Sequence, residues 1–260
     1  MNLENAASLV ARIDYVESTG STNTDLAEAA VMSPADYPDL SVLCAGSQSS
    51  GRGRAGRVWE SAAGASLSLS ILVRPKGVAL EHFGWLPILA GLAASRFVTG
   101  VLPASEVGLK WPNDVLVGDN KICGVLSELI GDGSGVVIGV GLNLTQAKDQ
   151  LPIEAATSLR LEGATISFEA AVTGFLAEFV ALYEQFVNHR GDATASELRR
   201  FATASCLSVG RRVRVMLPGD QTLEGRAVEI DDSGRLLIAV DGEQQLFAVA
   251  AGDIVHLRHN

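Results

Sequence analysis

The sequence predicts an α+β protein, in which a mixed β-sheet is covered by helices and followed by a small SH3-like β-barrel. Up to Ser205, strand-like apolar runs are interspersed with segments of helical periodicity. After Ser205, short strand-like runs follow one another and are separated by turn residues, a pattern typical of a small all-β domain. We therefore expect two domains, at residues 1–206 and 207–260.

The composition indicates a compact globular protein with an acidic surface. Hydrophobic residues make up 47% of the 260-residue chain and charged residues 19%, which is not the composition of a disordered protein. A formal net charge of −10 argues against general affinity for nucleic acid or for an anionic membrane. Cys44, Cys123 and Cys206 are widely spaced and form no CxxC motif, which suits the reducing cytoplasm and offers no metal-site spacing.

The larger domain is predicted from apolar periodicity and turn residues. Helical spacing of aromatic side chains over residues 167–188 predicts a core helix rather than a cofactor site. The apolar stretch at 83–94 is too short to cross a bilayer and predicts a buried helix at about 81–99. Other helices are expected at about 24–32, capped by residues 21–23, and at 195–204. Strands are expected at 12–16, 42–45, 67–73 and 109–115 (broken by a turn at Pro112), and as a hairpin of 122–129 and 136–144.

The barrel is predicted from alternating apolar residues between turn signals. Pro218-Gly-Asp, Asp231-Asp-Ser-Gly and Asp241-Gly are all typical of tight turns. They divide the C-terminal segment into strands near 211–217, 221–230, 235–240, 244–249 and 254–257.

A segment rich in arginine and glycine, residues 48–57, is the most distinctive feature of the sequence. Arg52, Arg54 and Arg57 are separated by glycines, and Trp59 follows them. Glycine allows backbone amides to approach a ligand closely, and the guanidinium fork matches a carboxylate or a phosphate. We interpret the segment as a flexible clamp that becomes ordered around a small anionic ligand.

The segment also partly matches other known patterns. Gly51 to Gly56 matches G-x-G-x-x-G, but a dinucleotide site also needs a helix here and an acidic residue about twenty positions further on, and the sequence offers neither. Gly46 and Gly51 have P-loop spacing, but Arg52-Gly53 stands where Lys-Ser/Thr is required. Arginine–glycine segments that bind nucleic acid are usually longer and carry more aromatic residues. A solvated basic loop with no ligand stays open as an alternative.

The second motif is Lys110-Trp-Pro-Asn-Asp114, which places a cation, an amide and a carboxylate around a turn. Asn113 and Asp114 offer oxygen ligands suited to Mg²⁺, and Lys110 offers a point charge for phosphate. The alternative is a turn in which Lys110 and Asp114 simply form an ion pair.

Taken together, these motifs resemble the biotin protein ligases. Five motifs occur in the order of that family: Ser21-Thr-Asn23, Gly51-Arg-Gly-Arg-Ala-Gly-Arg-x-Trp59, Lys110-Trp-Pro-Asn-Asp114, Lys121-Ile-Cys-Gly-Val-Leu-x-Glu128 and Gly139-Val-Gly-Leu-Asn143. The resemblance covers residues 12–145 and implies the class II synthetase-like catalytic fold of these ligases. It also implies activation of biotin with MgATP to biotinyl-5′-AMP, followed by transfer to a lysine of the biotin carboxyl carrier protein, an acyl-CoA carboxylase subunit.

The resemblance also implies roles for individual residues. Lys121, Arg54 and Arg52 would be catalytic, with Lys121 touching both the biotin carboxylate and the α-phosphate. Asp114 would hold Mg²⁺. The expected biotin-binding residues are Ser21, Thr22, Asn23, Gln48, Gly51, Arg52, Gly53, Arg54, Lys121 and Gly124. The expected ATP-binding residues are Arg54, Arg57, Trp59, Lys110, Asn113, Asp114, Lys121 and Asn143.

Two rival functions and two departures from the family remain. A lipoate ligase would share the broad scaffold, and a nucleic-acid-binding module could use the arginine segment; we expect neither nucleic acid nor membrane as a partner. Cys123 stands where a small aliphatic residue is expected. About a dozen residues precede the first strand, too few for a helix-turn-helix, so we expect a ligase without repressor activity.

Overall fold

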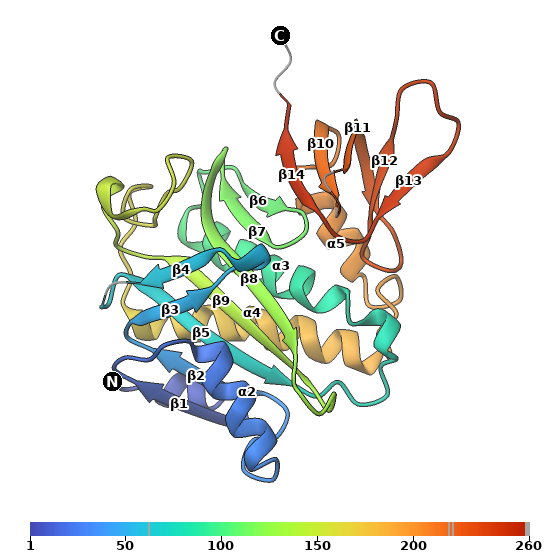
Figure 1. Ribbon diagram of the computed structural model, residues 1–260. Coiled ribbons are helices and arrows are strands. Elements are labelled where there is room, and N and C mark those ends of the chain that lie inside the picture. The colour runs from blue at the N-terminus through green and yellow to red at the C-terminus, as the bar shows by residue number, and fades with distance from the viewer. Residues whose placement is uncertain (62, 218, 220, 258–260) are drawn as a thin grey trace.

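A mixed seven-stranded sheet forms the centre of the molecule. The structure is a computed structural model that describes residues 1–61, 63–217, 219 and 221–257. The strand order is β1-β2-β5-β9-β8-β7-β6, with β1 parallel to β2 and every other pair antiparallel. The predicted mixed sheet is confirmed (Figure 1). The strands are β1 (Arg12–Val16), β2 (Ser41–Ala45), β5 (Ser66–Val73), β6 (Val107–Lys110), β7 (Asp114–Val117), β8 (Asn120–Leu129) and β9 (Val136–Asn143).

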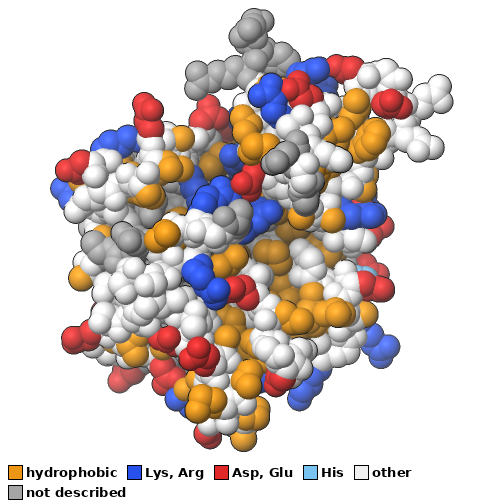
Figure 2. Space-filling view, in the orientation of Figure 1, with side chains coloured by type: hydrophobic (Ala, Val, Ile, Leu, Met, Phe, Trp, Pro, Cys, Tyr) orange, Lys and Arg blue, Asp and Glu red, His pale blue; other side chains and the backbone are white. Residues whose placement is uncertain are grey.

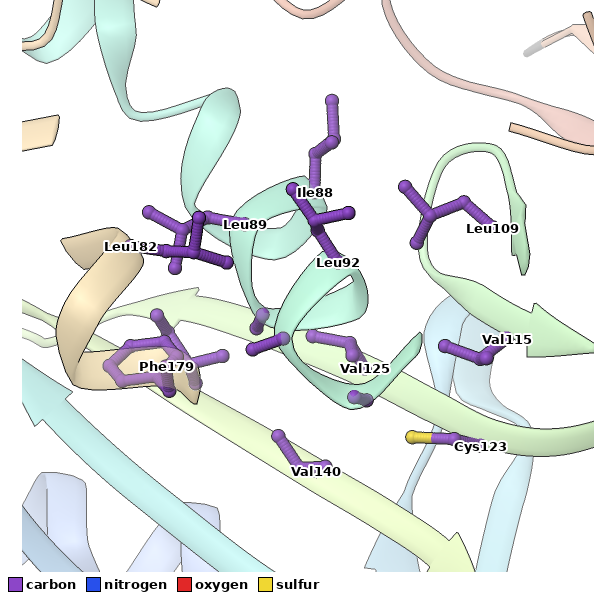
Figure 3. Close-up of a cluster of buried hydrophobic side chains, with 14 of the residues drawn as sticks. Ile88, Leu89, Leu92, Leu109, Val115, Cys123, Val125, Val140, Phe179 and Leu182 are labelled. Carbon is purple, nitrogen blue, oxygen red and sulfur yellow. The ribbon is translucent and has the colours of Figure 1, made fainter. Parts of the chain in front are cut away.

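Helices cover both faces of the sheet, and β5 shows why. Its odd positions, Leu67 to Val73, belong to the main core with α3 (Trp85–Val101) and α4 (Phe168–Asn188). In Figure 3, Ile88, Leu89 and Leu92 of α3 lie over the sheet residues Val125 and Val140. Leu72 points the other way and packs with Leu26 and Ala30 of α2 (Thr22–Met32). The strand was expected to be half-buried, but all eight of its residues are buried, including serines on the α2 side.

Two helical segments are long and apolar enough to cross a membrane when judged by length and composition. They are Leu80–Val101, which is 67% buried, and Phe168–Asn188, which is 44% buried. The first segment is longer than the stretch at 83–94 on which the sequence argument depended, so that argument from length was wrong. The buried helix expected at about 81–99 is nevertheless observed, because α3, like α4, contributes its apolar side chains to the core beneath the sheet.

The arginine–glycine segment is a β-hairpin and not an irregular loop. Strand β3 (Gln48–Arg52) pairs antiparallel with β4 (Val58–Ser61), and a 3₁₀ turn, η1 (Arg54–Gly56), joins them. The segment consists mostly of polar and glycine residues, so it has no alternation of apolar and polar side chains from which its strands could be predicted. The sequence also gave no signal for α1 (Glu4–Ala7), η2 (Leu80–His82) or η3 (Lys148–Gln150), and α5 (Leu198–Ser205) begins three residues later than expected.

The C-terminal strands form a separate five-stranded antiparallel sheet, consistent with the small SH3-like domain expected. Its order is β13-β12-β11-β10-β14, and it lies beyond α5 at one end of the molecule (Figure 1). The C-terminal sheet is joined to the larger domain by two buried indoles, those of Trp85 at the start of α3 and Trp111 directly after β6. They donate hydrogen bonds to the backbone oxygens of Asp232 and Gly234 in the β11–β12 turn, at 2.8 and 3.0 Å. The strands are β10 (Arg212–Leu217), β11 (Gln221–Ile230), β12 (Leu236–Ala239), β13 (Leu246–Val249) and β14 (Asp253–His256). The exact boundary at 206/207 stays a prediction.

Candidate active site

A cavity of about 430 Å³ lies where the hairpin β3–β4 crosses the larger sheet. Of the sixteen residues predicted to form the site, all of which the structure describes, only Gly51 is outside the lining. Gly51 pairs with Trp59 within the hairpin, and a Cβ there would lie 2.1 Å from the Trp59 carbonyl oxygen. The lining includes Ser21, Thr22, Asn23, Gln48, Arg52, Gly53, Arg54, Arg57, Trp59, Lys110, Asn113, Asp114, Lys121, Gly124 and Asn143.

One end of the cavity is a buried network of uncharged polar groups. The backbone N–H and the hydroxyl of Thr22 both donate to Gln48 Oε1, at 2.8 and 3.0 Å. Helix α2 begins at Thr22, two residues earlier than predicted, because the Ser21 hydroxyl caps it by accepting from Thr24 N. The Ser70 hydroxyl, on the serine side of β5, lies within hydrogen-bond distance of the Thr22 hydroxyl and of Asn23 Oδ1, at 2.7 and 2.6 Å. These amides and hydroxyls can recognise a neutral polar group by hydrogen bonds.

Arg52 closes the hairpin over this polar end. Its NH2 group lies 3.0 Å from Glu128 Oε2 and donates to the hydroxyl of Thr24 at 3.3 Å. Asn23 Nδ2 donates to the same Glu128 oxygen at 2.9 Å. The sequence analysis placed Glu128 in a motif but gave it no role, and Ser70 was noticed only as part of a strand. Both side chains hold predicted site residues in place.

The other end of the cavity carries most of its positive charge. Lys110, Lys121, Arg54 and Arg57 line it together, and Figure 2 shows basic side chains gathered at the centre of this face, below the C-terminal sheet. Burial lowers the pKa of Lys110, and the positive charges of Lys121 and Arg57 act in the same direction, against the attraction of Asp114. The positive charge of Lys110 is therefore only partly balanced by its surroundings. An anionic ligand would relieve that.

Asp114 forms an ion pair with Lys121 and not with Lys110. Lys121 Nζ lies 2.6 Å from Asp114 Oδ1, although the register of β6 and β7 places Lys110 directly opposite Asp114. The alternative considered for the second motif, an ion pair between Lys110 and Asp114, is therefore wrong. Lys121 Nζ also lies 5.6 Å from the centre of the Trp59 ring, within the range of a cation–π contact.

Arg54 and Arg57 extend from the hairpin toward the C-terminal sheet. Arg54 NH1 donates to Asn113 Oδ1 at 3.0 Å and NH2 to the Gly252 oxygen at 3.2 Å. Arg57 NH2 donates to Asp253 Oδ1 at 3.1 Å. Burial lowers the pKa of Arg54, opposed by the nearby carboxylate of Asp253. The contacts with Gly252 and Asp253 join segments almost 200 residues apart, so the sequence alone could not predict them.

Two glycines that face each other across β8 and β9 form the floor on which Trp59 lies. Gly124 pairs with Gly141. A Cβ on Gly141 would lie 2.3 Å from the Trp59 ring, and one on Gly124 would lie 3.1 Å from Lys121 Nζ. The indole Nε1 of Trp59 is buried and has no hydrogen-bond partner among the described residues, so it remains available as a donor to a ligand.

Asn143 and Cys123 complete this region in different ways. Asn143 Nδ2 donates to the Thr157 oxygen at 2.9 Å, and Asn143 Oδ1 accepts from Gln146. Cys123 is fully buried in the core beneath the cavity, and burial raises the pKa of its thiol to about 12. A thiol of that pKa stays protonated at neutral pH, which supports the interpretation that Cys123 only fills space.

The comparisons with known proteins identify the family. Residues 15–143 match the biotin/lipoate A/B protein ligase family, and residues 209–257 match the biotin protein ligase C-terminal domain. The chain is 42% identical over 249 residues to a biotin–[acetyl-CoA-carboxylase] ligase from Mycobacterium tuberculosis, covering 95% of this chain and 90% of that relative. The chain belongs to the biotin protein ligase family.

Other biotin protein ligases agree with this assignment. A bifunctional ligase/repressor BirA from Bacillus spizizenii is 31% identical, over 86% of this chain and 67% of the relative. The structure superposes on a biotin protein ligase from Aquifex aeolicus in complex with biotin and ATP with a TM-score of 0.77 and 25% identity, covering 96% of this chain and all of that one. The resemblance found in the sequence motifs is thus confirmed.

Proposed function

We propose that this protein activates biotin with MgATP to biotinyl-5′-AMP and then transfers the biotinyl group to a lysine of a biotin carboxyl carrier protein. The observation that carries the proposal is the division of one cavity into a polar end and a cationic end, the second lined by Lys121. The polar end at Thr22 and Gln48 suits the uncharged ureido ring of biotin. The cationic end suits a triphosphate, and membership of the biotin protein ligase family supports the same pair of substrates.

In the first step, an oxygen of the biotin carboxylate attacks the α-phosphorus while the bond from that phosphorus to the bridging oxygen breaks. Pyrophosphate leaves with that electron pair. Two unit charges 4 Å apart repel by about 4 kcal/mol at an effective dielectric of 20, so the approach of the two anions is itself a barrier. The ammonium of Lys121 offsets this repulsion and fixes the line of approach. No side-chain nucleophile is needed, because the substrate carboxylate attacks.

In the second step, the neutral amine of the acceptor lysine attacks the acyl carbon of the adenylate. The bond from that carbon to the phosphate oxygen breaks, AMP leaves, and the amine loses a proton. Between the two steps the mixed anhydride must be kept from water. The hairpin β3–β4, which Arg52 holds to Glu128 across the polar end, is the segment placed to exclude it.

Magnesium would enter this site with the nucleotide. Among the described residues, no three His, Cys, Asp or Glu side chains gather into a cluster that could hold a metal ion. Asp114 supplies one carboxylate at the cationic end, and Asn113 supplies an amide oxygen. One or two such ligands are what Mg²⁺ takes when phosphates and water complete its shell. The ion would neutralise phosphate charge there.

The test of the proposed function is incubation with biotin, MgATP and a carboxyl-carrier domain, with lipoate as competitor in a parallel sample. We expect biotin-dependent release of pyrophosphate that a tenfold excess of lipoate leaves unchanged. Transfer of a lipoyl group instead would favour the rival ligase. Retardation of nucleic acid on a gel, lost at higher salt, would favour the nucleic-acid-binding module, which a net charge of −10 opposes. We place the enzyme in the cytoplasm, in keeping with its unpaired cysteines.

Glu128→Gln is expected to weaken biotin binding, because it removes the charge that holds Arg52 while keeping the shape of the side chain. The pair is partly exposed, so the loss is about fivefold in Kd, near the upper limit for such pairs. Titration calorimetry with biotin measures it. Glu224→Gln is the matched control, because Glu224 pairs with Arg214 in the C-terminal sheet. An equal effect in both variants, or none in either, would contradict the role given to Glu128.

Biotin is expected to slow amide hydrogen exchange in residues 53–57, the turn of the hairpin, more than in the paired residues on either side. The pairing of Gly51 with Trp59 and of Arg52 with Val58 already protects the strands in the free protein. Peptide-resolved exchange with and without biotin measures the difference. Unchanged exchange in the turn would refute the clamp, which otherwise stays a prediction.

A further inference from the structure

A short segment at the start of β14, Gly252-Asp253, brings the C-terminal sheet into contact with two arginines at the cationic end of the cavity. Asp253 Oδ1 lies 3.1 Å from Arg57 NH2 and 3.8 Å from Arg54 NH1, and the Gly252 oxygen accepts from Arg54 NH2. Arg54 and Arg57 line the cavity, whereas Asp253 is not part of the lining. The carboxylate therefore contacts the two guanidiniums from outside the cavity lining.

This arrangement orients the arginines without occupying them. A guanidinium has five N–H donors in a rigid fork. Arg57 uses NH2 for Asp253, and Arg54 uses NH2 for Gly252 and NH1 for Asn113, with Asp253 further from NH1. Arg57 Nε donates in addition to the Arg54 oxygen, which ties the two residues together. The remaining donors can meet phosphate oxygens in the cavity. A carboxylate between two like charges also offsets their mutual repulsion.

The anchoring segment is itself held firmly. Asp253 pairs with Met216 in the register of β14 and β10. A Cβ on Gly252 would lie 2.9 Å from the Met216 oxygen and from Val215 Cγ1, so the backbone there is packed directly against β10. The sheet is fixed in turn to the larger layer through the indoles of Trp85 and Trp111. The carboxylate is thus presented from the C-terminal sheet to a hairpin that is also held by Arg52 at Glu128 and by the bridge between Thr19 and Gln48.

We propose that Asp253 is a positioning residue for adenylation, which holds Arg57 and Arg54 toward the triphosphate so that the C-terminal sheet completes the ATP-binding end of the site. The inference rests on the proposed function. Its consequence is selective: the affinity for ATP depends on Asp253, and the affinity for biotin does not. The polar end is built from Thr22 of α2, Gln48 of β3 and Ser70 of β5, all in the larger domain.

The test compares Asp253→Asn with Asp241→Asn, which removes the same charge from an ion pair with Arg212 elsewhere in the C-terminal sheet. We expect Asp253→Asn to raise KM for ATP about fivefold in biotin-dependent pyrophosphate release, near the upper limit for a partly exposed ion pair. The biotin Kd should stay within twofold of wild type. Asp241→Asn should leave both unchanged, and Asp253→Glu should recover part of the loss.

A double variant separates positioning from a general loss of structure. If Asp253 acts through Arg57, then Arg57→Ala combined with Asp253→Asn will have the same KM for ATP as Arg57→Ala alone. Additive effects, or equal KM values for Asp253→Asn and Asp241→Asn in the presence of an active wild type, would overturn the inference alone. Failure of the wild type to release pyrophosphate would overturn the proposed function, and this inference with it.

Discussion

Lys121→Ala is expected to lower the rate of biotin-dependent pyrophosphate release by about a thousandfold or more. Lys121 lines the cationic end of the cavity, and in the proposed mechanism its ammonium meets both the biotin carboxylate and the α-phosphate. Removing it restores about 4 kcal/mol of repulsion between two anions 4 Å apart, which corresponds to roughly three orders of magnitude in rate. Single-turnover release of pyrophosphate at saturating biotin and ATP measures the effect on the chemical step.

Lys121→Arg tests whether the site needs a compact ammonium or accepts any positively charged side chain. The planar fork is larger than an ammonium and would collide with Trp59 and with the floor at Gly124, where a Cβ would already be 3.1 Å from Nζ. We expect this variant to be severely impaired as well. Lys76→Ala, at an exposed position outside the cavity, is the control. Wild-type turnover of Lys121→Ala would refute the role of Lys121, and near-normal turnover of Lys121→Arg would refute the geometry.

Gly141→Val is expected to reduce adenylate formation by at least about a hundredfold while the melting temperature changes little. The first side-chain atom of any residue here would lie 2.3 Å from the Trp59 ring. Trp59 belongs to the two-stranded hairpin, which can move away from the sheet at smaller cost than a core residue. The valine would then fill the cavity floor and displace both Trp59 and the ligand. Adenylate can be quantified by mass spectrometry after a single turnover.

Gly131→Val is the matched control for this substitution. Gly131 lies in the turn between β8 and β9, and a Cβ added there meets no atom within 4 Å. The same increase in volume should therefore leave adenylation at the wild-type level. Full activity of Gly141→Val would show that Trp59 and the glycine floor are not part of the site. An equally large loss in Gly131→Val would show that the effect concerns the hairpin β8–β9 in general.

Much of the fold could be predicted because the strands of the larger sheet follow the simple rules of burial. The segments 12–16, 122–129 and 136–144 were placed to within two residues of the strands observed. The hairpin β3–β4 could not be found in this way. Its residues are serine, glycine and arginine, and its pairing depends on closing around a turn rather than on an apolar face.

The members of the site could be predicted better than their partners. The resemblance named fifteen residues that line one cavity, and their roles stay predictions. The ion pair considered as an alternative, Lys110 with Asp114, was wrong because spacing along the chain does not tell which side chains converge; Asp114 pairs with Lys121. The partners of Glu128, Ser70 and Asp253 could not be predicted for the same reason. Glu128 and Ser70 meet Asn23 only after β8 and β5 pack against α2, and Asp253 meets Arg57 only after β14 reaches the hairpin β3–β4. Contacts over 196 residues leave no local pattern in a single sequence.

The most direct measurement of the central claim is the intact mass of a carboxyl-carrier domain after incubation with the wild-type enzyme, biotin and MgATP, beside the same reaction with Lys121→Ala. We expect the carrier to gain the mass of one biotinyl group with the wild type only, and only when both biotin and ATP are present. An unmodified carrier with the wild type, or an equally labelled carrier with Lys121→Ala, would contradict the account.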